Sequence, residues 1–336
     1  MELRALATCD LHRHLEGAVR LRTILDLYPE AGEPLPEATP EELAPRAQVL
    51  RPMESLEEVL EVLRLVQGSF RSYDAIERIS REAVEDLAAD GVRLAELRFS
   101  PAFFFSPGGL DWDLAMERVV AGVGAAAAEL DVAVGLIAIF SRDYGIDSGW
   151  RTVAFAERHR EHLVGFDIAG PELPYPPQTY VELARAVHEL GLPLTAHYGE
   201  SGPPAYVRDA VELLGVRRLA HGVAAAQDPE VVALVRDRGV GLDVCPTSNV
   251  RTRAVPSLEE HPALRLLREG LLVTINTDDP GLFGIDLTHE LELCRDELGF
   301  TDEDLRAVTE NALRTSFLPE PTKAAVRARH FGWLDA

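Results

Sequence analysis

Short apolar runs alternate with amphipathic stretches along the whole chain. The runs that predict strands cover residues 5–14, 92–99, 132–140, 163–169, 192–197, 218–221, 240–245 and 271–278. Between them, apolar residues recur at helical spacing, most clearly over 73–89, 114–130 and 180–190. The run 132–140 is almost unbroken, as is typical of a strand buried on both faces. The pattern therefore predicts eight strands, each followed by a helix.

Strict alternation of strand and helix implies a parallel sheet with right-handed crossovers. Eight units predict an α/β fold of the (β/α)8 TIM barrel type. An open doubly wound sheet is the alternative, although no G-x-G-x-x-G follows a strand.

Two segments exceed the repeating unit of this barrel. Residues 20–72 are too long for a normal crossover, so we expect a helical insertion after the first strand that covers one mouth of the barrel as a lid. The tail from Leu287 onward predicts extra C-terminal helices, with Pro319 and Pro321 as breakers. No composition break divides the chain, so residues 1–336 are expected to form a single domain.

Composition and charge limit the kinds of molecule that the protein can be expected to bind. The chain has 336 residues, 46% of them hydrophobic, and a formal net charge of -23. Nucleic-acid binding relies on basic residues that neutralise phosphates, so a small molecule is the expected partner. The most apolar stretch, 119–130, is too short to span a membrane, and the N-terminus has no signal-peptide pattern. Three widely spaced cysteines suit a reducing compartment, which indicates a cytoplasmic protein. The sequence leaves open whether the chain forms a homo-oligomer.

In barrels of this type, reactive residues sit at the carboxyl ends of the strands. Those ends carry His12, His14, His197, His221, Asp278 and Asp279. Because strand residues alternate faces, the first two histidines point the same way. Imidazoles with one carboxylate suit zinc, with iron, cobalt or manganese as alternatives. The other six histidines fall in predicted helices or loops and are expected to be solvated: His159, His162, His188, His261, His289 and His330.

Two further features define the chemistry. Glu200 follows His197 by three residues, near the expected metal but free to move protons. Lys323 is the only lysine, so no carbamylated lysine can bridge two metals at the fourth strand. The residues alone therefore predict a metal-activated hydrolase with one ion.

Seven motifs together resemble those of the adenosine deaminase family, in order and over nearly the whole chain. They are His12-x-His14-Leu-Glu-Gly17, Leu97-Arg-Phe-Ser-Pro101, Asp167-Ile-Ala-Gly170-Pro-Glu172, His197-Tyr-Gly-Glu200, Ala220-His221-Gly222, Cys245-Pro-Thr-Ser-Asn249 and Asn276-Thr-Asp-Asp-Pro280. The H-x-E and P-C-x-x-C signature of cytidine-type deaminases is missing. The resemblance implies zinc-dependent deamination of a 6-aminopurine nucleoside, with adenosine or 2′-deoxyadenosine as the first expectation.

The resemblance also implies roles for individual residues. One Zn²⁺ per chain is expected on His12, His14, His197 and Asp278. The metal lowers the pKa of a water, which attacks C6 of the purine. His221 resembles the base and orienting group for that water, which Asp278 also contacts. Glu200 resembles the acid that protonates N1.

The purine and its sugar have their own implied contacts. Asp279 matches the residue bound to N7, and the backbone N–H of Gly170 matches the contact to N3. His14 and Glu16 are expected beside the substrate, Glu16 at the 5′ end of the sugar.

Departures from the family pattern leave open which sugar the site accepts on the substrate. Glu16 stands where adenosine-specific members usually have Asp, Tyr198 replaces a small residue, and Ala220 replaces a usual Gly. Arg251 and Arg253 follow the seventh strand, either as solvated loop residues or as contacts for an anionic substituent.

Four other readings of the function stay open. Aminodeoxyfutalosine is the rival nucleoside, while adenine is less expected because relatives that act on it tend to have Ser at Thr277. From other classes, an ester, lactone or phosphotriester hydrolase is disfavoured by the missing bridging lysine and the presence of Glu200. A non-catalytic nucleoside-binding relative is disfavoured because all ligand and proton-transfer residues are present.

Overall fold

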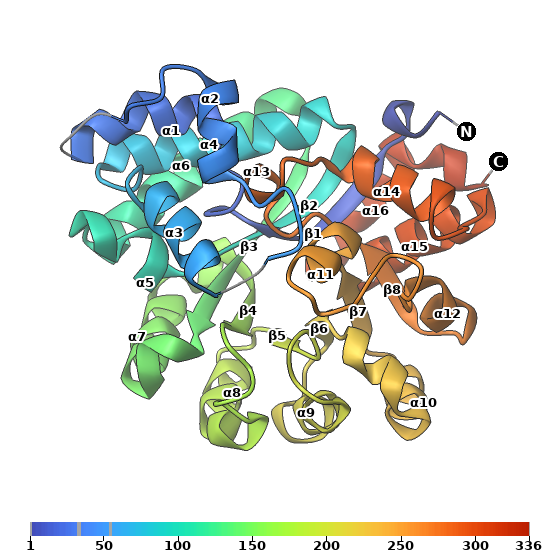
Figure 1. Cartoon of the computed structure of the whole chain (residues 1–336). Coiled ribbons are helices and arrows are strands. Elements are labelled where there is room, and N and C mark those ends of the chain that lie inside the picture. The colour runs from blue at the N-terminus through green and yellow to red at the C-terminus, as the bar shows by residue number, and fades with distance from the viewer. Residues whose placement is uncertain (1, 32–34, 54–55, 336) are drawn as a thin grey trace.

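Eight parallel strands lie in chain order and form one sheet that curves into a barrel (Figure 1). The computed structural model describes residues 2–31, 35–53 and 56–335. The strands are β1 (Thr8–His14), β2 (Val92–Phe99), β3 (Ala133–Ser141), β4 (Leu163–Ala169), β5 (Leu194–Tyr198), β6 (Arg218–His221), β7 (Gly241–Val244) and β8 (Leu272–Ile275). Their residues are almost all buried, because helices cover the outer face and side chains fill the interior.

The first and last strands meet at the carboxyl end of the barrel. Arg13 forms a parallel bridge with Asp278, three residues beyond the end of β8. The His14 N–H donates to the Asp278 carbonyl and the Asp278 N–H donates to the His12 carbonyl, both at 2.8 Å. These bonds bring the ends together, and the predicted (β/α)8 barrel is confirmed.

Sixteen α-helices occur among the described residues and surround the sheet. They are α1 (Leu21–Leu27), α2 (Pro40–Ala47), α3 (Leu56–Gln67), α4 (Tyr73–Ala89), α5 (Pro101–Phe104), α6 (Trp112–Leu130), α7 (Gly145–Arg158), α8 (Val181–Glu189), α9 (Pro204–Asp209), α10 (Pro229–Arg238), α11 (Pro246–Arg251), α12 (Ala263–Arg268), α13 (Pro280–Phe283), α14 (Leu287–Asp296), α15 (Asp302–Thr315) and α16 (Glu320–His330). None of them is both long and apolar enough to cross a membrane. The predicted extra C-terminal helices correspond to α14, α15 and α16.

The segment predicted as a lid contains α1, α2 and α3, although residues 32–34 and 54–55 lie outside the described residues. Its backbone is joined to the loops that follow β7 and β8. The Val49 N–H donates to the Leu282 carbonyl at 2.8 Å, and the Met53 N–H donates to the Arg251 carbonyl at 2.9 Å. The segment therefore lies against the carboxyl end of the barrel, and a lid function stays a prediction.

Arg251 and Arg253 take part in this attachment. The Arg251 guanidinium donates to the carbonyls of Val49, at 2.8 Å, and Phe283. Arg253 donates to the Met53 carbonyl at 2.6 Å. Arg251 thus binds backbone carbonyls of the insertion and of α13, and Arg253 binds one of the insertion, which leaves less of either guanidinium available for an anionic substituent.

A network of buried charges fills the barrel beneath the carboxyl ends of the strands. Arg98 contacts Asp167 at 2.9 Å and Asp243 at 3.4 Å. Arg218 contacts the same Asp243 at 2.9 Å and Glu96 at 2.5 Å. All five side chains are fully buried, so each charge needs the others to offset its desolvation. The network fixes the position of Asp167, which reaches the site described next.

Candidate metal centre and active site

The end of β1 presents two imidazoles to the mouth of the barrel. Residues 12 and 14 share a face of the strand, and their Nε2 atoms lie 3.3 Å apart. Both nitrogens approach one carboxylate oxygen, Asp278 Oδ1, at 3.1 Å from His12 and 3.3 Å from His14. Three potential ligand atoms from opposite ends of the chain therefore converge, as predicted.

Asp278 reaches this position through an unusual backbone. Its φ is 62°, in the left-handed region, which Asp tolerates better than most residues. The Ser248 hydroxyl donates to Asp278 Oδ2 at 2.7 Å and fixes the carboxylate plane. Burial opposes ionisation, but contact with His12, His14 and His221 holds the pKa of Asp278 well below its usual range. The group is thus an anion at neutral pH.

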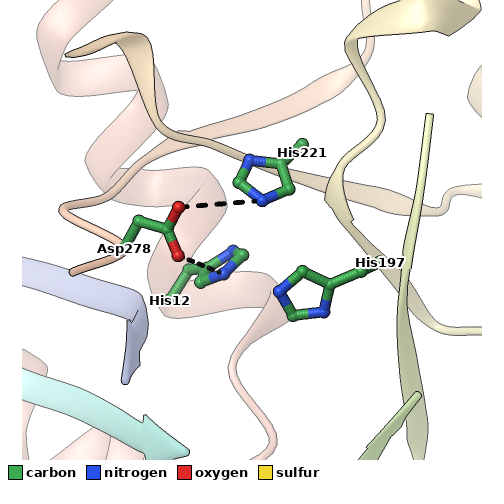
Figure 2. A group of neighbouring side chains, drawn as sticks. All are labelled: His12, His197, His221 and Asp278. Carbon is green, nitrogen blue, oxygen red and sulfur yellow. Dashed lines mark ion pairs between the residues drawn. The ribbon is translucent and has the colours of Figure 1, made fainter. Parts of the chain in front are cut away.

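His197, at the end of β5, supplies a third imidazole. Its Nδ1 lies 3.2 Å from Asp167 Oδ1, and Asp167 is itself held by Arg98. The contact with Asp167 orients the ring so that Nε2 faces His12, as Figure 2 shows. A carboxylate behind a histidine in this way is typical of metal sites, where it fixes the tautomer.

His221 enters the same cluster from β6. The ligand atoms of His12, His197, His221 and Asp278 all lie within 4.8 Å of one another (Figure 2). Five groups, with His14, therefore surround one point, although the predicted ligand set contains four. His221 also has a left-handed backbone, with φ of 64°, and its Nε2 lies 3.6 Å from Glu200 and 3.8 Å from Asp278.

The donor set fits a divalent cation of the zinc type. Burial lowers the pKa of His12 well below its ordinary value and that of His197 to about 4, so both rings are neutral at pH 7. Neutral imidazole has a free lone pair, which is the form that binds metal. With one ionised carboxylate the site supplies nitrogen and oxygen ligands and no sulfur, as catalytic zinc sites do.

Glu200 lies at the edge of this cluster and is held by a residue whose role the sequence did not reveal. Glu172 accepts the backbone N–H groups of Gly199, Glu200 and Ser201 at 2.7, 2.9 and 2.7 Å. Burial raises the pKa of Glu200, and the nearby carboxylates of Asp278 and Glu172 add to this effect. The raised pKa favours the protonated form that a proton donor needs. Glu172 lies in a loop without periodicity, so nothing in the sequence indicates that its carboxylate accepts these three N–H groups.

The remaining predicted residues follow the carboxyl ends of three strands, Glu16 after β1, Gly170 after β4 and Asp279 after β8. Burial, with the charge of Asp278, raises the pKa of Asp279 to about 8, and burial raises that of Glu16 to about 7. Glu16 Oε1 accepts the Ser100 N–H at 2.6 Å, while Oε2 is buried without a hydrogen-bond partner among the described residues. Gly17 lies against Asp279, and a Cβ at this glycine would overlap the carboxylate. Gly170 has φ of 89°, and its carbonyl accepts from Arg142.

Tyr198, which departs from the family pattern, follows His197 in β5 and so points to the opposite face of the strand. It is buried, and its hydroxyl donates to the Tyr175 carbonyl at 3.1 Å. The Arg142 guanidinium stacks on its ring, 4.1 Å from the centroid, and donates to the carbonyls of Gly170 and His197. The substitution therefore packs the outer face of β5 and braces the ends of β4 and β5.

One prediction about the other histidines is wrong. His261 was expected to be a solvated loop residue, but it is 8% exposed and contacts Asn249. Solvation was inferred from its place between a loop and a short helix, and the tertiary fold overrides that inference by packing the loop onto α11. Of the other five, His159 and His330 are partly exposed and His162, His188 and His289 are exposed.

The chain is similar in sequence and in fold to several known proteins. Residues 7–330 match the family model described as adenosine deaminase. An adenosine deaminase of Erwinia tasmaniensis is 37% identical over 324 residues, which cover 96% of this chain and 98% of that protein. The crystal structure of an adenine deaminase from Arthrobacter aurescens aligns with a TM-score of 0.90 and 29% identity, covering 99% and 100% of the two chains. An amidohydrolase from Burkholderia ambifaria, solved with bound zinc, aligns with a TM-score of 0.88 and 30% identity, covering 99% and 92%.

Proposed function

Since this chain belongs to the adenosine deaminase family, we propose that it hydrolyses adenosine and 2′-deoxyadenosine to inosine and 2′-deoxyinosine, with release of ammonia. The observation that carries the proposal is the convergence of His12 and His14 on one oxygen of Asp278, with Glu200 beside them. This arrangement provides what attack on a purine needs, ligands for an ion that activates water and a separate proton donor. A matching fold by itself would not specify this reaction.

We propose one zinc ion per chain in this centre. The ligands we assign to it are His12, His14, His197 and Asp278. When bound, the ion would act as a Lewis acid and lower the pKa of a water, so that the water can lose a proton near neutral pH. The zinc bound to the Burkholderia amidohydrolase supports this choice of metal.

The protein's own residues handle the protons. Water adds to C6 as Glu200 gives its proton to N1, so that the ring loses aromaticity without building up negative charge on nitrogen. One proton of the water passes to the amino group, which leaves as ammonia when the C6–N6 bond breaks. The other water proton returns to Glu200 as the hydroxyl on C6 becomes a carbonyl. His221, between Glu200 and Asp278, orients the water on the face of C6 that is attacked.

The substrate contacts favour a nucleoside. We assign N7 of the purine to Asp279, which at a pKa of about 8 keeps a proton to donate, and N3 to the Gly170 N–H. The unpartnered Oε2 of Glu16 is an acceptor for a sugar hydroxyl, and His14 borders the same space. A buried polar atom without a partner costs free energy, so a ligand that brings a hydroxyl to Glu16 gains over one that does not.

Adenine is the second candidate, because a solved structural neighbour is an adenine deaminase. Free adenine has no hydroxyl for Glu16, and the adenosine deaminase relative is more similar in sequence, at 37% against 29%. Aminodeoxyfutalosine has less support, since Arg251 is already bound to two carbonyls.

The test is a substrate panel on the zinc-loaded protein: adenosine, 2′-deoxyadenosine, adenine, methylthioadenosine and aminodeoxyfutalosine. Loss of absorbance at the purine band and ammonia release are followed together. We expect the highest kcat/KM for adenosine and 2′-deoxyadenosine. Preferred turnover of adenine would reject the nucleoside assignment, and ammonia release from none of the five would reject the function.

Two further assignments belong to this proposal. The 20–72 insertion acts as the lid of a single-domain enzyme, supported by its bonds to the loops after β7 and β8. The enzyme works in the cytoplasm, supported by three cysteines that are all free and buried.

A further inference from the structure

A chain of hydrogen bonds runs from a backbone amide to His221 through two buried side chains. The Ala263 N–H lies 3.2 Å from His261 Nδ1, and His261 Nε2 lies 3.3 Å from Asn249 Oδ1. Asn249 Nδ2 lies 3.0 Å from His221 Nδ1. The three side chains come from the loop before α12, from α11 and from the end of β6, and the fold buries all of them. Neither Asn249 nor His261 has a role in the chemistry described above.

The donor and acceptor in each of these hydrogen bonds follow from the bond between the Ala263 N–H and His261. A backbone N–H can only donate, so His261 Nδ1 must accept and carries no proton. A neutral His261 then has its proton on Nε2, and burial lowers its pKa to about 4, which keeps the ring neutral. The Asn249 atom that faces this proton must be the oxygen, and its amide nitrogen therefore faces His221. His221 Nδ1 must accept in turn.

We propose that His261 is a positioning residue, which acts through Asn249 to hold His221 in the tautomer that carries its proton on Nε2. The Nε2 atom faces Glu200 Oε2 at 3.6 Å and Asp278 Oδ2 at 3.8 Å, where the water is expected. An N–H at this place donates to the water oxygen and aims a lone pair of that oxygen away from His221. Of the two roles implied for His221, this tautomer supports orienting the water.

The same tautomer decides whether His14 or His221 is the third imidazole ligand. A ring nitrogen that bears a proton has no lone pair for a metal, so His221 in this form cannot coordinate the ion. His14, whose Nε2 lies 3.3 Å from both His12 Nε2 and Asp278 Oδ1, then completes the set. The relay thus explains why five groups can surround a site for four.

The tautomer can be read without substrate. In metal-free protein labelled with 15N-histidine, two-bond proton–nitrogen correlations show which ring nitrogen carries the proton. We expect His221 to be protonated at Nε2 in the native chain. In Asn249→Asp both carboxylate oxygens accept, so we expect His221 to move its proton to Nδ1. An Nδ1 proton in the native chain, or an unchanged tautomer in Asn249→Asp, would overturn the proposal.

The consequence for turnover rests on the proposed function and is measured separately. His261→Phe keeps the ring but loses the donor, and we expect kcat to fall on the order of tenfold with little change in KM. His261→Gln can restore a donor toward Asn249 Oδ1 and should recover most of the loss, whereas His289→Phe, at an exposed histidine, should change nothing.

The outcomes of the two experiments are distinguishable. Wild-type kcat in His261→Phe, or no rescue by Gln, would reject the positioning role. A chain that deaminates no purine but keeps the expected tautomer would reject the function alone. If His261→Phe fails to fold, two other measurements decide whether His261 positions His221. They are the tautomer of His221 in Asn249→Asp and the ratio of kcat in His261→Gln to kcat in His261→Ala.

Discussion

His221 and Asp278 both adopt left-handed backbones, with φ of 64° and 62°, and their side chains face each other with Nε2 3.8 Å from Oδ2. Each residue lies where a strand has just ended or is ending. At both positions the positive φ departs from the extended strand conformation at the carboxyl end of the barrel. Such conformations cost free energy in residues other than glycine, and they cluster at functional sites.

The first prediction concerns Asp278. Asp278→Asn and Asp278→Ala should both lose most of the bound zinc, because each removes the only carboxylate of the proposed ligand set. In metal-free protein, Asp278→Ala should be the less stable of the two by roughly 1 kcal/mol, since alanine tolerates a left-handed backbone less well than asparagine. Elemental analysis and denaturant unfolding measure the two effects. Full zinc retention in either variant would remove Asp278 from the ligand set.

The second prediction concerns the proton donor. Glu200→Gln keeps the shape of the side chain and removes its acidic proton, so kcat should fall by about 10² to 10⁴ while zinc content is unchanged. Glu189→Gln, at an exposed position on α8, makes the same substitution away from the site and should leave kcat unaltered. Steady-state kinetics with adenosine test both variants. Turnover by Glu200→Gln at the wild-type rate would assign the proton transfer to another group.

The third prediction tests the role of Asp279 by a substitution at Gly17, which lies against it. A methyl group at Gly17 would overlap the Asp279 carboxylate, so Gly17→Ala should displace it from the purine. Loss of one buried hydrogen bond corresponds to a decrease in kcat/KM of roughly ten- to a hundredfold. Gly124→Ala is the matched control, because a Cβ on this helical glycine meets nothing within 4 Å and alanine favours helix. Equal kcat/KM in Gly17→Ala and the native chain would show that Asp279 makes no such contact.

The fourth prediction concerns pH and stability. Burial raises the pKa of Glu290 from 4.5 to about 7, and the residue contacts neither substrate nor metal in our assignment. A carboxyl with a raised native pKa stabilises the fold when protonated, so this contribution is complete below pH 4.5 and is lost as the pH rises through about 7. Glu290→Gln cannot ionise, and its stability relative to the native chain should therefore improve by about 3 kcal/mol between pH 4 and pH 8. Urea unfolding at the two pH values measures it, with exposed Glu292→Gln as control. A constant difference would show that Glu290 titrates normally.

The barrel, and the approach of His12 and His14 to Asp278, could be predicted because both follow from local patterns. Each strand is an apolar run, and a parallel barrel places the ends of all strands at one rim whatever the loops do. His12 and Asp278 could therefore be expected to meet although 265 residues lie between them. Helix and strand bounds then differ from expectation by only a few residues, as at β8, expected over 271–278 and observed as Leu272–Ile275.

The residues that support the centre could not be predicted in the same way. Glu172 holds Glu200 through three backbone N–H groups, a contact that depends on how two loops meet. His261 was misjudged because nothing in the neighbouring sequence indicates that its loop packs against α11. Arg251 looked like a residue open to solvent or ligand, yet it binds carbonyls of two segments far away in the chain. Loop packing has no periodicity, so these partners emerge only from the folded chain.

The seam between β1 and the end of β8 has a consequence for assembly. The amides of His14 and Asp278 hydrogen-bond across this seam, and ligands from both sides meet directly above it. An ion on the ligands we propose would link the beginning of the polypeptide to a segment made much later, so the centre would form only once both segments are present. Chelation should accordingly loosen this junction before the rest of the cylinder, and these two amides should be among the first to exchange with deuterium.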